Sequence, residues 1–157
     1  MDDRGVVSWQ LGRPAHPFRR VARRCAYGFP AVTEQPPFTD DGRPFPTTYY
    51  LTCPWLVAGI ARVEAGGGVA RWARAAAESD ALRTSLARAD AEQRGMRPEF
   101  DVGIGGTRAP GALKCLHAHA AFALARPGYE LGEQILAEAG ELWCPDGRCA
   151  RATGAAA

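Results

Sequence analysis

Five cysteines are the residues of this chain best suited to chemistry. They are Cys25, Cys53, Cys115, Cys144 and Cys149. Two of them lie in compact segments beside other informative residues, Cys53 before Pro54 and Cys115 two positions before His117. Thiolate and imidazole are the preferred ligands of zinc, which takes four protein ligands in a structural site and three plus water in a catalytic one. The cysteines therefore indicate either a soft-ligand metal site or a reactive thiol.

A metal site in this chain would have to be assembled by the fold, because the sequence contains no C-x2-C pair. We predict Cys25 at a strand turn, Cys53 at a strand-to-helix junction and Cys115 in the first turn of a helix. Ends of elements are places where ligands distant in sequence can converge. Zinc is the favoured ion, and an iron–sulfur cluster is a less favoured occupant of the same thiolates.

The histidine ligand is open between His117 and His119. On a regular helix, Cys115 and His119 lie one turn apart on one face, whereas His117 falls on the apolar stripe. If Cys115 precedes the regular helix, however, its direction is free and it can converge with His117. Helical geometry therefore favours His119 only if Cys115 is itself helical.

Other roles for the cysteines lead to different functions. Cys53, placed just before a helix, would meet the positive end of the helix dipole, which lowers a thiol pKa and favours a nucleophile with a histidine as base. Cys144 and Cys149 could bind metal, form a switchable disulfide or have no role. In a third hypothesis the chain is an interaction module without a chemical site, and its cysteines are small buried hydrophobes.

A cluster of arginines near the N-terminus is the second chemical feature. Arg19, Arg20, Arg23 and Arg24 occur with no acidic residue among them. Such a cluster could contact RNA, a nucleotide or polyphosphate, although charge runs of this kind usually face water. We predict an anion-binding strand on this basis.

The composition is that of one cytosolic domain. The chain has 157 residues, 46% of them hydrophobic and 23% charged, with a net charge of +2. This length suits a single domain with its own core. No stretch approaches the roughly 18 apolar residues of a membrane helix, and the N-terminus does not resemble a secretory signal. We therefore expect a cytoplasmic protein with reduced cysteines and no membrane partner.

Turn and cap signals divide the chain into strands followed by helices, which predicts an α+β fold. A small N-terminal antiparallel sheet is predicted from residues 19–25, 29–34 and 47–52. Four or five helices should follow, at residues 54–65, 69–93 with a break near Ser79, 112–125 and 131–142. Residues 18–143 would form the single domain. Residues 1–17 are expected to be loosely ordered with one short strand at residues 6–9, and residues 144–157 to form a frayed tail containing two cysteines.

Three motifs, in order, resemble one known family. They are RCAYGFPAV at residues 24–32, PFPTTYYLTCP at residues 44–54 and KCLH at residues 114–117. The chain resembles, over roughly residues 10–135, a small bacterial family known as domain of unknown function number five hundred and one. The resemblance implies no activity, substrate or cofactor. It does direct attention to four residues inside the motifs: Cys25, Cys53, Cys115 and His117.

The leading hypothesis is therefore a zinc site built from Cys25, Cys53, Cys115 and His117, which fastens the sheet to the helices. The arginine strand beside it would bind a phosphate-bearing partner. The second hypothesis is a cysteine-dependent enzyme or redox protein that uses Cys53 with His117. The third is the interaction module without a site.

Overall fold

A three-stranded antiparallel sheet forms the N-terminal part of the fold, as predicted. The computed structural model describes residues 2–153. Its strands are β1 (Arg20–Arg24), β2 (Pro30–Glu34) and β3 (Tyr49–Leu51), in the order β1-β2-β3. The first two strands form a hairpin in which Gly28 has a φ of 85°, a conformation that suits glycine. The central strand, β2, is buried along almost its whole length.

Helices make up the rest of the domain. Among the described residues they are α1 (Asp3–Leu11), α2 (Pro54–Ala65), α3 (Gly68–Glu78), α4 (Asp80–Met96), α5 (Leu116–Ala125) and α6 (Glu130–Glu138), with short 3-10 helices η1 (Ile104–Gly106) and η2 (Arg148–Thr153). Pro54 begins α2 as predicted, where its missing N–H costs no hydrogen bond. Ser79 separates α3 from α4, also as predicted, and its side chain accepts from Leu82 N–H. The α+β prediction is therefore confirmed.

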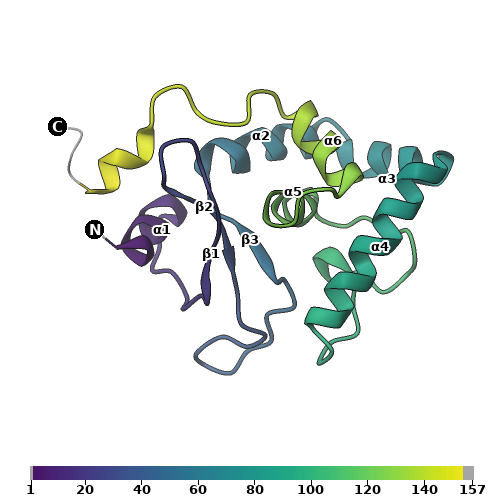
Figure 1. Ribbon diagram of the computed structural model, residues 1–157, viewed down its shortest axis with the longest axis horizontal. Coiled ribbons are helices and arrows are strands. Elements are labelled where there is room, and N and C mark those ends of the chain that lie inside the picture. The colour runs from purple at the N-terminus through teal and green to yellow at the C-terminus, as the bar shows by residue number, and fades with distance from the viewer. Residues whose placement is uncertain (1, 154–157) are drawn as a thin grey trace.

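Helix α5 is the centre of the core. It lies between the sheet and helices α2, α4 and α6 (Figure 1), and nearly all of its residues are buried. A helix that is apolar on every side can be stable only when neighbours cover it all round. Its alanines let those neighbours approach closely, and the first turn of this helix carries His117.

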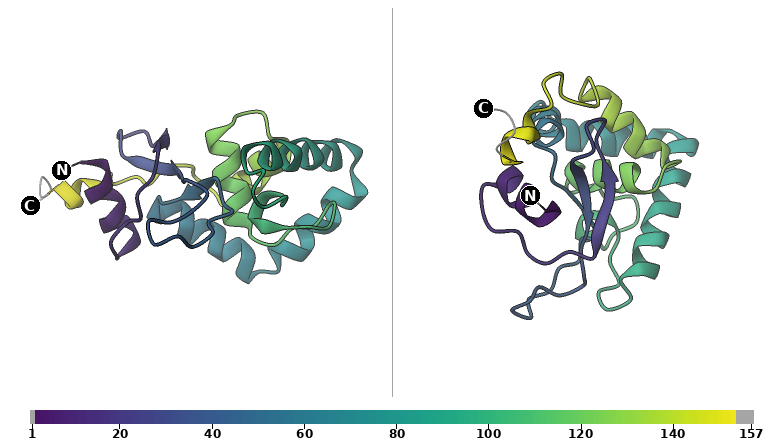
Figure 2. Two further views of the ribbon diagram at one scale, coloured as in Figure 1. Left: turned by 90° about the horizontal axis from the view of Figure 1, so that it is seen from below. Right: turned by 60° about the vertical axis from the view of Figure 1, so that its left-hand side comes forward.

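The N-terminal prediction was wrong. The loose segment with a strand at residues 6–9 is instead helix α1, which lies on the opposite side of the sheet from α3–α6 (Figures 1 and 2). Asp2 caps the helix by accepting from Gly5 N–H at 2.8 Å, and Gly12 ends it in the left-handed conformation. Val6 and Val7 are buried, so the helix is held by packing as well as by its caps.

The C-terminal segment is also better ordered than predicted. Helix η2 packs on α1 (Figure 2). Val6, Cys149 and Ala152 form a small apolar cluster there, with Phe29 beside it. The frayed tail predicted for residues 144–157 is therefore wrong for residues 144–153, and residues 154–157 lie outside the described part of the chain.

Several helix boundaries differ from the prediction. Helix α4 continues to Met96, beyond the predicted end at residue 93. Helix α6 ends at Glu138 instead of residue 142, because Gly140 has a φ of 103°. Helix α5 begins at Leu116 instead of residue 112, and Cys115 before it is extended. No helix in residues 2–153 combines the length and apolar character needed to cross a membrane.

The contact between α5 and α6 depends on Gly132. A Cβ at this position would lie 2.7 Å from the Ala123 Cβ, 2.7 Å from Tyr129 Cδ2 and 2.8 Å from the His119 carbonyl oxygen. We predict that Gly132→Ala lowers the free energy of unfolding by about 1–3 kcal/mol, the usual cost of overpacking. Urea denaturation measures the change. Gly95→Ala is the matched control, because its Cβ would meet nothing within 4 Å; its stability should stay within about 1 kcal/mol of the wild type. Equal stability of the two variants would contradict the close packing.

Candidate metal centre

Glu64, Cys115 and His117 converge where the last turn of α2 meets the start of α5. Their potential ligand atoms, a carboxylate oxygen, the thiol sulfur and an imidazole nitrogen, all lie within 4.8 Å of one another. Among the His, Cys, Asp and Glu side chains of residues 2–153, no other three are as close. The group combines the oxygen, sulfur and nitrogen ligands that zinc accepts in proteins.

Backbone hydrogen bonds fix the outer atoms of this group. The Leu116 N–H donates to Glu64 Oε2 at 2.8 Å, and His117 Nε2 lies 3.1 Å from the Val57 carbonyl oxygen. Because a carbonyl can only accept, Nε2 carries a proton. His117 Nδ1 then faces the other carboxylate oxygen, Glu64 Oε1, at 3.3 Å. Metal sites commonly orient their ligands in this way, with a second hydrogen bond on the far atom of each ligand.

The electrostatics of the pair Cys115 and His117 favour charged forms. Hydrogen bonding to His117 lowers the pKa of the Cys115 thiol, an effect larger than the opposing effect of burial. The pKa of His117 is raised, first by hydrogen bonding to Cys115 and further by the Val57 carbonyl and the Glu64 carboxylate, against the opposing effect of burial. The thiol is thus already disposed to lose the proton that a metal would displace.

One side of the group is open to a pocket of about 270 Å³. Cys115, His117 and Val57 line it on the helical side. The opposite wall is largely apolar and comes from α1 and the region of β3: Leu11, Thr47, Tyr49, Tyr50 and Leu51. Cys115 and His117 line this pocket, whereas Glu64 does not, so a metal ion held by the group would have these two ligands on the side of the pocket.

His119 has a different environment from His117. It is fully buried, and its Nδ1 lies 2.8 Å from the Tyr129 hydroxyl oxygen. Burial lowers the pKa of His119 to about 4, so the ring is neutral. The helical argument that paired His119 with Cys115 assumed a helical Cys115. Because Cys115 is extended, it converges with His117, as the alternative argument allowed.

The four residues of the zinc site predicted from the sequence are found in two places. Cys115 and His117 lie with Glu64, whereas Cys25 and Cys53 line a different, smaller pocket together with Cys144 and Cys149. Glu64 could not be predicted from the sequence, because it lies 52 residues from the backbone group it binds and no local motif marks it.

Cys53 does not have the properties expected of a reactive thiol. It precedes α2 as predicted but makes no capping hydrogen bond with its side chain. The backbone groups of Leu56 and Trp55 favour a lower pKa of the thiol. Burial nevertheless raises its pKa, and this effect exceeds the lowering by the backbone groups. The pKa of Cys53 is therefore shifted in the direction opposite to the one expected from the helix dipole alone.

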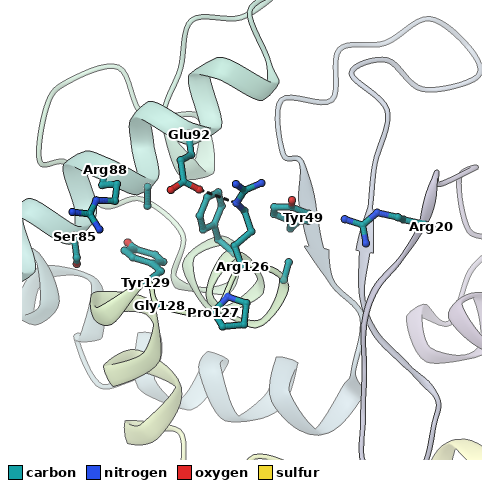
Figure 3. Close-up of a pocket in the computed structure, with 12 residues that line it drawn as sticks. Arg20, Tyr49, Ser85, Arg88, Glu92, Arg126, Pro127, Gly128 and Tyr129 are labelled. Atoms are coloured by element: carbon teal, nitrogen blue, oxygen red, sulfur yellow. Dashed lines mark ion pairs between the residues drawn. The ribbon is translucent and has the colours of Figure 1, made fainter.

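A second cavity, of about 510 Å³, is lined by three arginines (Figure 3). Arg88 on α4 and Arg20 on β1 approach it from opposite sides, and Arg126 at the end of α5 lies between them. Arg126 forms an ion pair with Glu92 at 2.8 Å and Arg20 one with Glu34 at 3.0 Å. Within residues 2–153, Arg88 has no ion pair or hydrogen bond.

The arginines predicted to bind anions are dispersed around β1. Only Arg20 lines this cavity. Arg24 pairs with Asp3 at 2.7 Å, and Arg23 lies over the Trp143 ring with its guanidinium carbon 5.8 Å from the centroid. Arg19 is exposed and takes no part in the cavity. Arg88 and Arg126 could not be predicted from the sequence to line the same cavity, because only the fold brings them near Arg20.

The Cys115–His117 pair predicts selective thiol chemistry. In chelator-treated protein, iodoacetamide should label Cys115 faster than the buried Cys53 and Cys149, because only Cys115 has a lowered pKa. Peptide mass spectrometry measures the rates. His117→Gln should slow labelling of Cys115 severalfold at neutral pH and much less at alkaline pH, whereas His16→Gln should have no effect. Equal labelling of all three thiols would contradict the pairing.

Comparisons with known proteins give a family but no function. A search of curated proteins and a search of solved structures each found no match. The sequence model of one family, described as a protein of unknown function (DUF501), matches residues 21–137. This segment runs from within β1 to within α6 and includes all three residues of the Glu64, Cys115 and His117 group. The chain belongs to the DUF501 family.

Proposed function

We propose that this protein binds one zinc ion through Glu64, Cys115 and His117, with the fourth coordination position directed to the adjacent pocket. The observation that supports this most strongly is the convergence of three different ligand atoms within 4.8 Å. Glu64 takes the place that the sequence analysis gave to Cys25 and Cys53. The ligands would be Glu64 Oε1, Cys115 Sγ and His117 Nδ1, because Oε2 and Nε2 are engaged by backbone groups.

A zinc ion bound in this way would lower the pKa of a bound water to about 7 and supply a hydroxide nucleophile. The chain itself supplies the surroundings. Leu51 and Val57 exclude water from part of the pocket and favour a substrate with an apolar portion. A reducing compartment keeps a thiol ligand free of disulfides, which agrees with the expected cytoplasmic location.

A cysteine-dependent reaction is the alternative use of the same group. Hydrogen bonding to His117 favours the Cys115 thiolate, and Glu64 orients the imidazole. In this alternative Cys115 replaces Cys53 as the nucleophile. The two functions differ in one respect that can be measured, because bound zinc would protect Cys115 from alkylation and a nucleophilic Cys115 would react without it.

The arginine-lined cavity supports a second candidate function, the binding of a small phosphate-bearing molecule such as a nucleotide or polyphosphate. Arg20, Arg88 and Arg126 outnumber the single carboxylate, Glu92, that lines the cavity. Arg88 is the specific observation in favour, because its guanidinium has no protein partner in the described chain. A cavity of this volume suits a small ligand better than RNA, which would need an extended surface.

Zinc content tests the main proposal. Cys115→Ser and His117→Gln should each hold about one zinc ion less per chain than the wild type, because three ligands are the minimum of such a site. Inductively coupled plasma mass spectrometry after purification under reducing conditions, without an affinity metal, gives the count. Glu64→Gln should weaken binding by at least about 10–100-fold, the range seen for changes around metal ligands. His16→Gln is the control and should bind normally. Unchanged zinc in Cys115→Ser would exclude this site.

Pyrophosphate and ATP test the arginine cavity. Arg88→Glu should weaken their binding more than tenfold in isothermal titration calorimetry, because it replaces an attraction by a repulsion. Arg74→Glu, a substitution with the same charge change on an exposed part of α3, should reduce it much less. Added salt should weaken binding to the wild type. Equal binding by the two variants, or binding of RNA alone, would contradict a phosphate site in this cavity.

A further inference from the structure

Four cysteines from three distant parts of the chain line one small pocket. Cys25 lies in the turn after β1, Cys53 precedes α2, and Cys144 and Cys149 belong to the C-terminal segment. Figures 1 and 2 show these three segments side by side at the end of α2, with the C-terminal segment passing over the hairpin. The pocket is separate from the Glu64 group, since it includes neither Cys115 nor His117.

We propose that Cys25, Cys53, Cys144 and Cys149 bind a second zinc ion that fastens the C-terminal segment to the hairpin and to α2. Four thiolates are one of the ligand sets of structural zinc sites. The pocket that the four cysteines line together with other residues has a free volume of about 10 Å³, which is room for one particle the size of a water molecule. This volume favours a single ion over an iron–sulfur cluster.

The polar groups around the sulfur atoms are donors. The Tyr27 backbone N–H lies 3.4 Å from Cys25 Sγ, and Gln10 Nε2 lies 3.3 Å from Cys149 Sγ. A thiol can both donate and accept, but a thiolate only accepts, so these two sulfurs are surrounded as metal-bound thiolates are.

A positive side chain lies beside the same pocket. The Arg148 guanidinium carbon is 5.2 Å from the centroid of the Trp55 ring, and this guanidinium interacts with Cys144 and Cys149. Zinc with four thiolates carries a net charge of −2, which a nearby arginine would partly offset. Arg148 also forms an ion pair with Asp146 at 3.1 Å, so part of its charge is offset without a metal site.

The C-terminal segment already has two fixed points next to the pocket. The Tyr27 hydroxyl donates to the Cys144 carbonyl at 2.9 Å, and Trp55 Nε1 donates to the Glu141 carbonyl at 2.7 Å. In a tetrahedral site with zinc–sulfur bonds of about 2.3 Å, sulfur atoms lie about 3.8 Å apart. No three of the four sulfurs lie within 4.8 Å of one another in the described structure, so zinc binding must bring the sulfur atoms closer together.

Zinc content in three variants tests this second site. The double variant Cys144→Ser/Cys149→Ser and the single variant Cys53→Ser should each lose about one zinc ion per chain. Cys115→Ser should keep that ion, so loss of the Glu64 site and loss of this site are distinguishable. Cys149→His, which replaces one zinc ligand by another, should retain zinc. Unchanged zinc in the double variant would overturn the proposal, and so would iron with a visible absorption band.

A measurement on the wild type covers the case in which the serine variants do not fold. Alkylation followed by peptide mass spectrometry should show that four thiols are protected together: Cys25, Cys53, Cys144 and Cys149. All four should become reactive together when a chelator is added. Two results would also overturn the proposal. One is that the four thiols are labelled independently of one another under reducing conditions. The other is a disulfide among them in protein that was prepared anaerobically and without reductant.

Discussion

The hydrogen bond between Glu64 and the first N–H group of α5 is the contact on which the candidate site depends. The Leu116 N–H meets Glu64 Oε2 at 2.8 Å, so a side chain from α2 satisfies one of the free donors at the start of α5. The negative charge also lies at the positive end of the helix dipole. This contact fixes where α5 begins. Cys115 is then left extended before the helix, and His117 comes to lie in its first turn beside the same carboxylate.

The same contact joins the fold to the chemistry. Helix α5 is the most enclosed helix of the domain, and α2 is one of the elements that cover it. A side chain that caps α5 from α2 therefore helps to position two helices as well as three ligands. A substitution of Glu64 would therefore disturb both the cap of α5 and the candidate metal site. Cys115 and His117 are half-buried and their side chains do not cap the helix, so they can be changed with less effect on the core.

Local signals in the sequence predicted much of the fold and little of the sites. Pro54, Ser79 and the hairpin at Gly28 each specify structure within a few residues, and all three have the predicted effect. Helix α1 was missed because Gly5 within it and Gly12, Pro14 and Pro17 after it suggest a loop. Its stability comes from caps and from packing against η2 at the other end of the chain. To choose between His117 and His119, one has to know the residue at which α5 begins. That residue depends on a contact with Glu64, 52 residues away in the sequence. The division of the cysteines between two sites is equally non-local.

The central claim is that Glu64, Cys115 and His117 hold a zinc ion. Anomalous diffraction at the zinc absorption edge, from crystals of protein purified without added metal, tests it most directly. The expected result is a peak about 2.3 Å from Cys115 Sγ and about 2.0–2.2 Å from His117 Nδ1 and a Glu64 oxygen. A map with no peak between these three residues, in crystals whose Cys115 is reduced and unmodified, would contradict it.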